Sequence, residues 1–190
     1  MDKKIKLLLG ILVFVVLLVG AFFAYELLLS GVGDNLPENL VQGRQEEGSL
    51  QQRAPDFTIL DMDDNEVRLS DFIGTPVILN FWASWCPTCV REKPYFDELY
   101  ETMGDEVRIL KINLLDGQQE TRNTVEAFMA GRDHVFPIYF DTTGEATRAY
   151  GVIFLPMTFF INAEGYVAAR AQGSVNEETL RRGIELIMPQ

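Results

Sequence analysis

Residues 80–89 read Asn-Phe-Trp-Ala-Ser-Trp-Cys-Pro-Thr-Cys, and this stretch decides the fold. A nearly continuous apolar run from Pro76 to Trp82 leads into it, as expected of a strand that is covered on both faces. Pro87 comes after a short turn and suits the first position of a helix, because no backbone donor is lost there. The pattern predicts a strand, a turn and a helix, with Cys86 at the N-terminus of the helix.

The chain contains two cysteines, Cys86 and Cys89, and they are three residues apart. The unpaired N–H groups and the dipole at a helix N-terminus favour the thiolate of Cys86. Cys89 follows one turn later on the same face, close enough to form a disulfide bond with Cys86. Cys86 would attack a substrate disulfide, and Cys89 would resolve the mixed disulfide. We therefore predict a redox-active centre that needs no cofactor and no metal.

Other uses of the two cysteines fit poorly. A zinc site needs four ligands, and the chain has one histidine, His134, far away in sequence. Attachment of a c-type haem would require histidine at the position of Val90. A purely structural disulfide that closes so short a loop would add little stability. The pair therefore favours redox catalysis.

The rest of the folded part alternates between strand-like and helix-like patterns. Short strand-like runs at 57–60 and 67–69 flank Asp63-Asp64-Asn65, a turn composition that predicts an N-terminal β-hairpin. Further strands are expected at 107–112, 137–140, 158–161 and 167–171, and helices at 87–103, 120–129 and 176–188. This order predicts an α/β sandwich with a mixed central sheet.

The N-terminal segment differs from the rest of the chain. Leu7 to Tyr25 is 19 residues without a charge, and Lys3, Lys4 and Lys6 precede it. Its length suits one transmembrane helix, and the lysines place the N-terminus in the cytoplasm. A cleaved signal peptide is the alternative, but the small residues expected at a cleavage site are poorly matched. The pattern favours an uncleaved signal-anchor, single-pass in the cytoplasmic membrane.

These patterns divide the chain into three parts: a membrane anchor at 1–29, a flexible linker at 30–53 and a folded domain at 54–190. The linker contains Gly, Gln, Glu and Asn with few bulky apolar residues. The net charge is −12 although the first six residues are basic, so the domain outside the membrane is acidic. Such a domain is not suited to nucleic acid. We expect a monomer.

Four stretches resemble a known family. Residues 80–89 are similar to the active-site segment of the thioredoxin superfamily. Residues 54–57 (Ala-Pro-Asp-Phe), 69–74 (Leu-Ser-Asp-Phe-Ile-Gly) and 150–162 resemble its extracytoplasmic TlpA/ResA branch, with an AhpC/TSA–redoxin type domain. The resemblance implies a thioredoxin-like fold and a tethered thiol–disulfide oxidoreductase. It also implies that the protein reduces protein disulfides, for example the CxxCH thiols of apocytochrome c during cytochrome c maturation, with electrons from a membrane protein of the CcdA type.

The resemblance assigns roles to individual residues. Pro156 corresponds to a cis-proline that faces the CxxC motif, and the backbone of Leu155 would bind an extended substrate segment. Trp85, Pro87 and Thr88 would complete the docking surface. Pro94 matches a proline that kinks the active-site helix.

A titratable group beside the cysteines is also expected. Thioredoxin has a buried aspartate where this chain has Asn80, which cannot titrate. Glu92 resembles the active-site glutamate of the branch and is the third catalytic candidate, since a carboxylate with a raised pKa could exchange a proton with Cys89. The alternative is an exposed helix glutamate that pairs with Arg91 or Lys93.

Other functions remain open. Pro87-Thr88 replaces the Glu-Pro pair that is common in the branch, and Met157 replaces a common threonine, so the redox potential cannot be carried over. A peroxiredoxin-like thiol peroxidase would have Thr or Ser in place of Ala83 and Pro in place of Leu79. A disulfide-oxidising enzyme and a non-catalytic, tethered chaperone module are further alternatives.

Overall fold

The computed structural model describes residues 18–20, 52–132 and 135–189, and it divides the chain into two units, Met1–Arg44 and Gln45–Gln190. In the first unit only residues 18–20 are described, and they are helical. Most of the predicted anchor, most of the predicted linker and His134 therefore lie outside the described residues. Among the residues that are described, none belongs to a helix that is long and apolar enough to cross a membrane.

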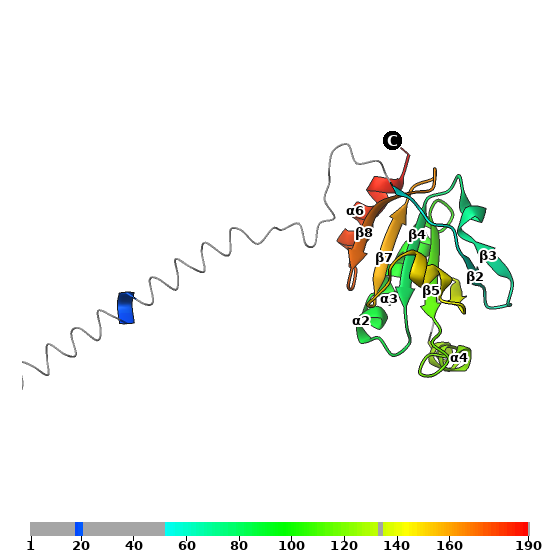
Figure 1. Cartoon of the computed structure of the whole chain (residues 1–190). Helices are drawn as coiled ribbons and strands as arrows, with labels where there is room; N and C mark the ends of the chain where they lie inside the picture. The colour runs from blue at the N-terminus through cyan, green and yellow to red at the C-terminus, as the bar shows by residue number, and fades with distance from the viewer. Residues whose placement is uncertain (1–17, 21–51, 133–134, 190) are drawn as a thin grey trace, which may run out of the picture. The chain divides into compact units, whose positions relative to one another are not determined.

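The second unit is built on one mixed sheet of eight strands (Figure 1). Its spatial order is β1-β8-β7-β4-β5-β6-β2-β3. β4, β5 and β6 are parallel neighbours, and all other neighbouring strands are antiparallel. The strands are β1 (Gln52–Arg53), β2 (Thr58–Leu60), β3 (Glu66–Arg68), β4 (Val77–Trp82), β5 (Arg108–Leu114), β6 (Ile138–Asp141), β7 (Met157–Ile161) and β8 (Tyr166–Gln172).

The central strand β4 explains why the run before the cysteines is apolar. All six of its residues are buried, because β5 and β7 flank it and side chains cover both faces of the sheet. Alternate residues join two separate core clusters, with Ile78 in one and Leu79 in the other. This alternation is the two-residue period of a strand. The strand predicted from the sequence is confirmed.

Helices cover the sheet on both faces. They are α2 (Pro87–Arg91), α3 (Lys93–Met103), α4 (Arg122–Met129), α5 (Glu145–Ala149) and α6 (Glu177–Ile187), with a 3₁₀ turn η2 (Leu69–Phe72). Residues of α3, α4 and α6 belong to the core cluster that contains Ile78 and both cysteines. Residues of η2 and α5 belong to the other cluster. The predicted α/β sandwich with a mixed sheet is confirmed, as is the N-terminal hairpin formed by β2 and β3.

One detail agrees with the resemblance, and two differ from the expectation. The helix expected at 87–103 is divided at Glu92, two residues before Pro94, which has no N–H to donate to the preceding turn; this agrees with the kink that the resemblance implied at Pro94. Gln52 and Arg53 pair with β8, so the sheet begins two residues before the expected start of the domain. α5 was not predicted, because it is short and buries only Ala146.

Candidate active site

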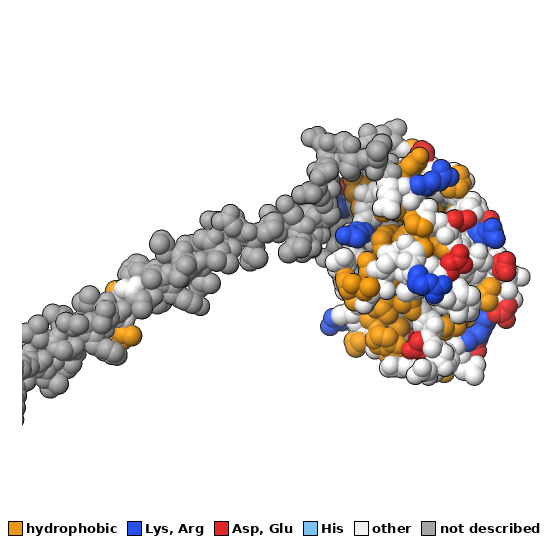
Figure 2. Space-filling view, viewed as in Figure 1, with side chains coloured by type: hydrophobic (Ala, Val, Ile, Leu, Met, Phe, Trp, Pro, Cys, Tyr) orange, Lys and Arg blue, Asp and Glu red, His pale blue; other side chains and the backbone are white. Residues whose placement is uncertain are grey.

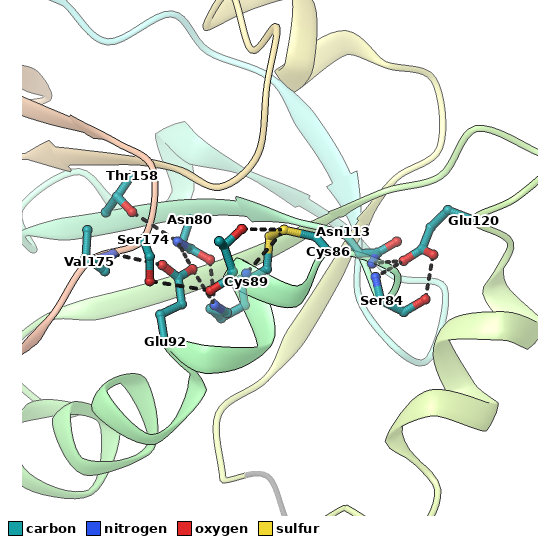
Figure 3. The surroundings of a disulfide bond; sticks show 12 residues. Asn80, Ser84, Cys86, Cys89, Glu92, Asn113, Glu120, Thr158, Ser174 and Val175 are labelled. Carbon is teal, nitrogen blue, oxygen red and sulfur yellow. Dashed lines mark hydrogen bonds and ion pairs between the residues drawn. A yellow bond between two sulfur atoms is a disulfide. The ribbon is translucent and has the colours of Figure 1, made fainter.

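β4 and α2 position the two cysteines as the sequence predicted. Cys86 caps the N-terminus of α2, and Pro87 occupies the first helical position. Cys86 and Cys89 form a disulfide bond (Figure 3). The sulfur of Cys86 accepts a hydrogen bond from the backbone N–H of Cys89 at 3.2 Å and lies 3.3 Å from the hydroxyl of Thr88. Once the disulfide is reduced, these groups stabilise a thiolate at Cys86.

The disulfide lies beneath a surface with exposed hydrophobic side chains. Both cysteines are buried, whereas Trp85 is 50% exposed and Pro87 is also exposed. Figure 2 shows hydrophobic side chains gathered over the part of the visible face where α2 lies. A partner can therefore contact apolar surface next to the disulfide, which is typical of a protein-binding site.

The loop before β7 approaches the same end of the sheet. The Leu155–Pro156 peptide bond is cis, as the family resemblance implied. Pro156 directly precedes Met157, which pairs with Phe81 near the end of β4. Leu155 packs against the core cluster that contains both cysteines. The register of the sheet thus brings the cis-proline loop to the strand that leads into the CxxC motif.

Glu92 is fully buried, so the alternative of an exposed helix glutamate is wrong. Its Oε1 accepts a hydrogen bond from Nδ2 of Asn80 at 2.8 Å, and its Oε2 accepts one from the backbone N–H of Val175 at 3.1 Å. Its cationic partner is Lys111, whose Nζ lies 3.6 Å from Oε1. Neither Arg91 nor Lys93 takes the role that the alternative gave them. Glu92 belongs to an internal polar network (Figure 3).

Three neighbouring strands supply the rest of this network. Asn80 on β4 pairs in register with Lys111 on β5 and with Thr158 on β7. Lys111 donates from Nζ to Oδ1 of Asn80 at 2.5 Å, and Asn80 donates from Nδ2 to the hydroxyl of Thr158 at 3.0 Å. Lys111 was missed by the sequence reasoning. Its signal was a lysine in the middle of the apolar strand run Ile109 to Ile112.

Burial shifts both charged members of the network toward neutrality. It raises the pKa of Glu92, and the charge of Lys111 and the hydrogen bonds from Val175 and Asn80 oppose this rise. It lowers the pKa of Lys111 to about 8, and the charge of Glu92 opposes this fall. Both groups are thus closer to exchanging protons near neutral pH than they would be in water, as proton transfer in an active site requires.

A second buried carboxylate holds the turn in front of Cys86. Oε1 of Glu120 accepts hydrogen bonds from the backbone N–H of Ser84 and from Nδ2 of Asn113, both at 2.6 Å, and Oε2 accepts one from the hydroxyl of Ser84, also at 2.6 Å. The sequence placed Glu120 in a helix, but α4 begins only after Thr121, its N-cap. Glu120 instead reaches back to the turn between β4 and α2. No pattern in the sequence pointed to this contact.

Nothing in the described part of the chain forms a cluster of three or more histidine, cysteine or acidic side chains that could hold a metal ion. The reactive groups that the structure places at the site are the two sulfur atoms and the carboxylate and ammonium groups of Glu92 and Lys111. A dithiol next to titratable groups at a helix N-terminus suits thiol–disulfide exchange.

Comparison with known proteins agrees with this geometry. The model of the AhpC/TSA family matches residues 50–170. The chain belongs to this family. Thiol-disulfide oxidoreductase ResA of Bacillus cereus is 35% identical over 164 residues, which are 86% of this chain and 92% of that protein. ResA of Bacillus subtilis is 34% identical over 152 residues, which are 80% of this chain and 83% of that protein.

A solved structure extends the similarity to three dimensions. The crystal structure of StoA from Bacillus subtilis matches with a TM-score of 0.60 at 29% identity, and the match covers 68% of this chain and 96% of that one. Within the AhpC/TSA family the chain is thus a thiol–disulfide oxidoreductase of the ResA type with a thioredoxin-like fold. Its CxxC motif is the pair Cys86 and Cys89.

Proposed function

We propose that this thiol–disulfide oxidoreductase reduces protein disulfides outside the cytoplasmic membrane, with Cys86 as the nucleophile. The observation that carries the proposal is the position of Cys86 at the N-terminus of α2, where the N–H of Cys89 and the hydroxyl of Thr88 already meet its sulfur. These groups stabilise negative charge on Cys86, so that it is the sulfur that attacks first.

The proposed reaction has two steps. In the first, the thiolate of Cys86 bonds to one sulfur of the substrate disulfide, and the other substrate sulfur leaves as a thiolate and takes a proton. In the second, Cys89 loses its proton and attacks the sulfur of Cys86, so that the mixed disulfide breaks and the second substrate thiol is released. Two electrons pass from the dithiol to the substrate, and the Cys86–Cys89 disulfide remains.

Glu92 is the proposed acceptor of the proton from Cys89. It is three residues further along the helical backbone, a spacing that puts the two side chains on the same face. Its burial raises its pKa, which brings a carboxylate closer to the working range of a general base. Asn80, at the position where thioredoxin has an aspartate, has no proton to exchange and serves instead to hold Glu92 by a hydrogen bond.

We propose that substrate docks on Trp85, Pro87, Thr88, Leu155 and Pro156. The exposure of Trp85 and the packing of Leu155 against the core cluster that contains both cysteines support this assignment. Leu155 would offer its backbone to an extended substrate segment, as an added strand does at a sheet edge. The flanking Ile153 and Phe154 are also exposed and enlarge the apolar surface of this loop.

The setting of the domain is part of the proposal. The uncharged segment 7–25 behind three lysines supports a single transmembrane anchor within residues 1–29, followed by a linker at 30–53 and the catalytic domain at 54–190. The resemblance of residues 54–57, 69–74 and 150–162 to the TlpA/ResA branch supports apocytochrome c as a substrate and a CcdA-type membrane protein as the electron donor.

The test uses the full-length protein in detergent micelles. The reduced protein should reduce a disulfide-bonded CxxCH peptide, and its reduction potential should be well below about −120 mV, the value of a strong disulfide-introducing enzyme. A potential near that value would contradict the proposed direction.

A second experiment identifies the substrate. A Cys89→Ala variant should retain its substrate as a mixed disulfide with Cys86, which mass spectrometry of the purified adduct would identify. Cys86→Ser is the matched control and should retain nothing. An assay of peroxide consumption with a dithiol reductant distinguishes the peroxidase alternative, and we expect no turnover above that of the Cys86→Ser control.

A further inference from the structure

Lys111 is a buried cation that the two-step reaction does not yet use. Lys111 is 2% exposed and lies in the middle of β5. Its Nζ lies 4.0 Å from the centre of the Phe96 ring. Taking an ammonium group out of water is costly unless the charge is paired and hydrogen-bonded. Lys111 has both Asn80 and Glu92 within reach, at 2.5 Å and 3.6 Å.

Lys111 also lines a small cavity together with the resolving cysteine. The cavity has a volume of about 20 Å³ and is lined by Cys89, Val90, Lys93 and Lys111 together with Trp82, Phe128, Met129 and Phe136. Cys89 and Lys111 therefore line the same mostly apolar space, and Glu92 adjoins it through its 3.6 Å contact with Nζ of Lys111. In such an environment charges influence one another strongly.

The charged and titratable groups that act on Lys111 come from the helices above the sheet. Glu92 stands between α2 and α3, and Asp97 and Lys93 belong to α3. From the sheet itself β4 and β7 contribute the uncharged side chains of Asn80 and Thr158. Nζ of Lys93 lies 2.5 Å from Oδ2 of Asp97, and the Lys93 side chain is partly exposed to solvent. Of the groups named, Glu92 acts most strongly on Lys111.

We propose that Lys111 is a positioning residue that keeps Glu92 ionised, so that Glu92 can take the proton of Cys89 in the resolving step. This inference rests on the proposed function and deepens it. When the proton moves from the Cys89 thiol to Glu92, the negative charge moves from the carboxylate to the sulfur. Lys111 stays charged beside both groups, so the transfer separates no new charges inside the protein.

Removal of the Lys111 cation would change the protonation of Glu92. Without Lys111, Glu92 would be an isolated buried carboxylate, and burial would raise its pKa further. A protonated Glu92 cannot accept another proton, so Cys89 would stay a thiol and the mixed disulfide would persist. The first step would be little affected, because the sulfur of Cys86 relies on the N–H of Cys89 and the hydroxyl of Thr88.

The experiment follows the two steps separately in the full-length, reduced protein. A chromogenic aryl disulfide releases one coloured thiolate when Cys86 attacks it and a second when Cys89 resolves the mixed disulfide. The first phase depends on the concentration of the reagent, and the second is intramolecular. Stopped-flow traces between pH 5 and 9 are compared for the wild type, Lys111→Met, Glu92→Gln and the double variant. Lys93→Met removes a cation from the wall of the same cavity and is the matched control.

We expect Lys111→Met to slow the second phase about tenfold at neutral pH and to move its pH midpoint upward by about one unit or more. The first phase should stay within threefold of the wild type, and Lys93→Met should leave both phases within threefold. In the Glu92→Gln background, Lys111→Met should add less than a twofold change, because Lys111 acts through Glu92.

Three results would overturn the inference: a normal second phase in Lys111→Met, an equal slowing of both phases, or a full tenfold effect of Lys111→Met without Glu92. A global loss of structure would slow both phases alike. The failure of the proposed function is distinguishable from these results. A wild-type protein that shows both phases with the aryl disulfide but does not reduce a CxxCH peptide would contradict only the choice of substrate.

Discussion

Removal of Glu120 should destabilise the domain through the turn that precedes the nucleophile. Three hydrogen bonds of 2.6 Å end on its carboxylate, two from Ser84 and one from Asn113. A hydrogen bond to a charged group contributes about 1.5–3 kcal/mol, and water that enters the vacated space recovers part of this. We therefore expect Glu120→Ala to lower the free energy of unfolding by about 3–5 kcal/mol.

The conservative variant should cost much less. In Glu120→Gln the amide oxygen can still accept from Ser84 and Asn113, and the hydroxyl of Ser84 can rotate to accept from the new NH₂ group. The three contacts become neutral hydrogen bonds of about half the strength, so we expect a loss of about 1–2 kcal/mol. Glu126→Ala is the matched control on α4. Its exposed ion pair with Arg122 contributes about 0.5 kcal/mol or less.

Equilibrium unfolding in urea of the full-length protein in detergent micelles, with the disulfide intact, measures these differences. With a slope of about 2 kcal/mol per molar urea, Glu120→Ala should lower the midpoint by about 2 M. If the urea midpoint of Glu120→Ala lies within about 0.5 M of the wild-type midpoint, the carboxylate contributes no more to the free energy of unfolding than an exposed residue does. The reasoning from its three contacts would then be refuted.

Three further predictions concern packing, docking and pH. Gly183→Ala should destabilise the domain by about 2 kcal/mol or more, although alanine favours helices, because the new Cβ would lie 2.1 Å from the Phe160 ring. Unfolding in urea measures this loss, and an unchanged midpoint would contradict the packing of α6. Trp85→Ala should lower kcat/KM for a disulfide-bonded CxxCH peptide about tenfold, because Trp85 is exposed beside the disulfide. The rate of the first phase with the small aryl disulfide should stay within threefold of the wild type. Equal losses with both substrates would exclude a docking role for Trp85. The pKa of Glu92 is raised in the folded state, so its contribution to stability is present below its ordinary pKa of 4.5 and is lost as the pH rises through the raised pKa. The free energy of unfolding of the wild type minus that of Glu92→Gln should therefore decrease from pH 4 to pH 8. An increase of this difference with pH would mean that the pKa of Glu92 is lowered instead.

The elements around the cysteines could be predicted because local patterns determine them. The apolar run of β4 and the proline at the first position of α2 lie within a few residues of the motif that they position. The β2–β3 hairpin likewise follows from its turn residues. The cis bond before Pro156 required the family resemblance, because an X-Pro bond alone favours the trans form.

The polar interior could not be predicted in the same way. Lys111 meets Asn80 across 31 positions of sequence, and Glu120 meets Ser84 across 36. Neither contact leaves a periodic pattern, since each depends on how strands and loops pack in three dimensions. A lysine within the apolar run of β5 was nevertheless a usable signal, because a charge in a buried strand requires a partner.

The role of Asn80 changes once the network is known. From the sequence it marked only the absence of the aspartate that thioredoxin has at this position. In the structure its amide meets three partners at once, as it donates to Glu92 and Thr158 and accepts from Lys111. An ionised aspartate could not donate to Glu92, and two carboxylates beside a single lysine would tend to share a proton. The amide on β4 and the carboxylate after α2 are therefore complementary, because a single buried acid beside Lys111 requires a neutral donor at position 80.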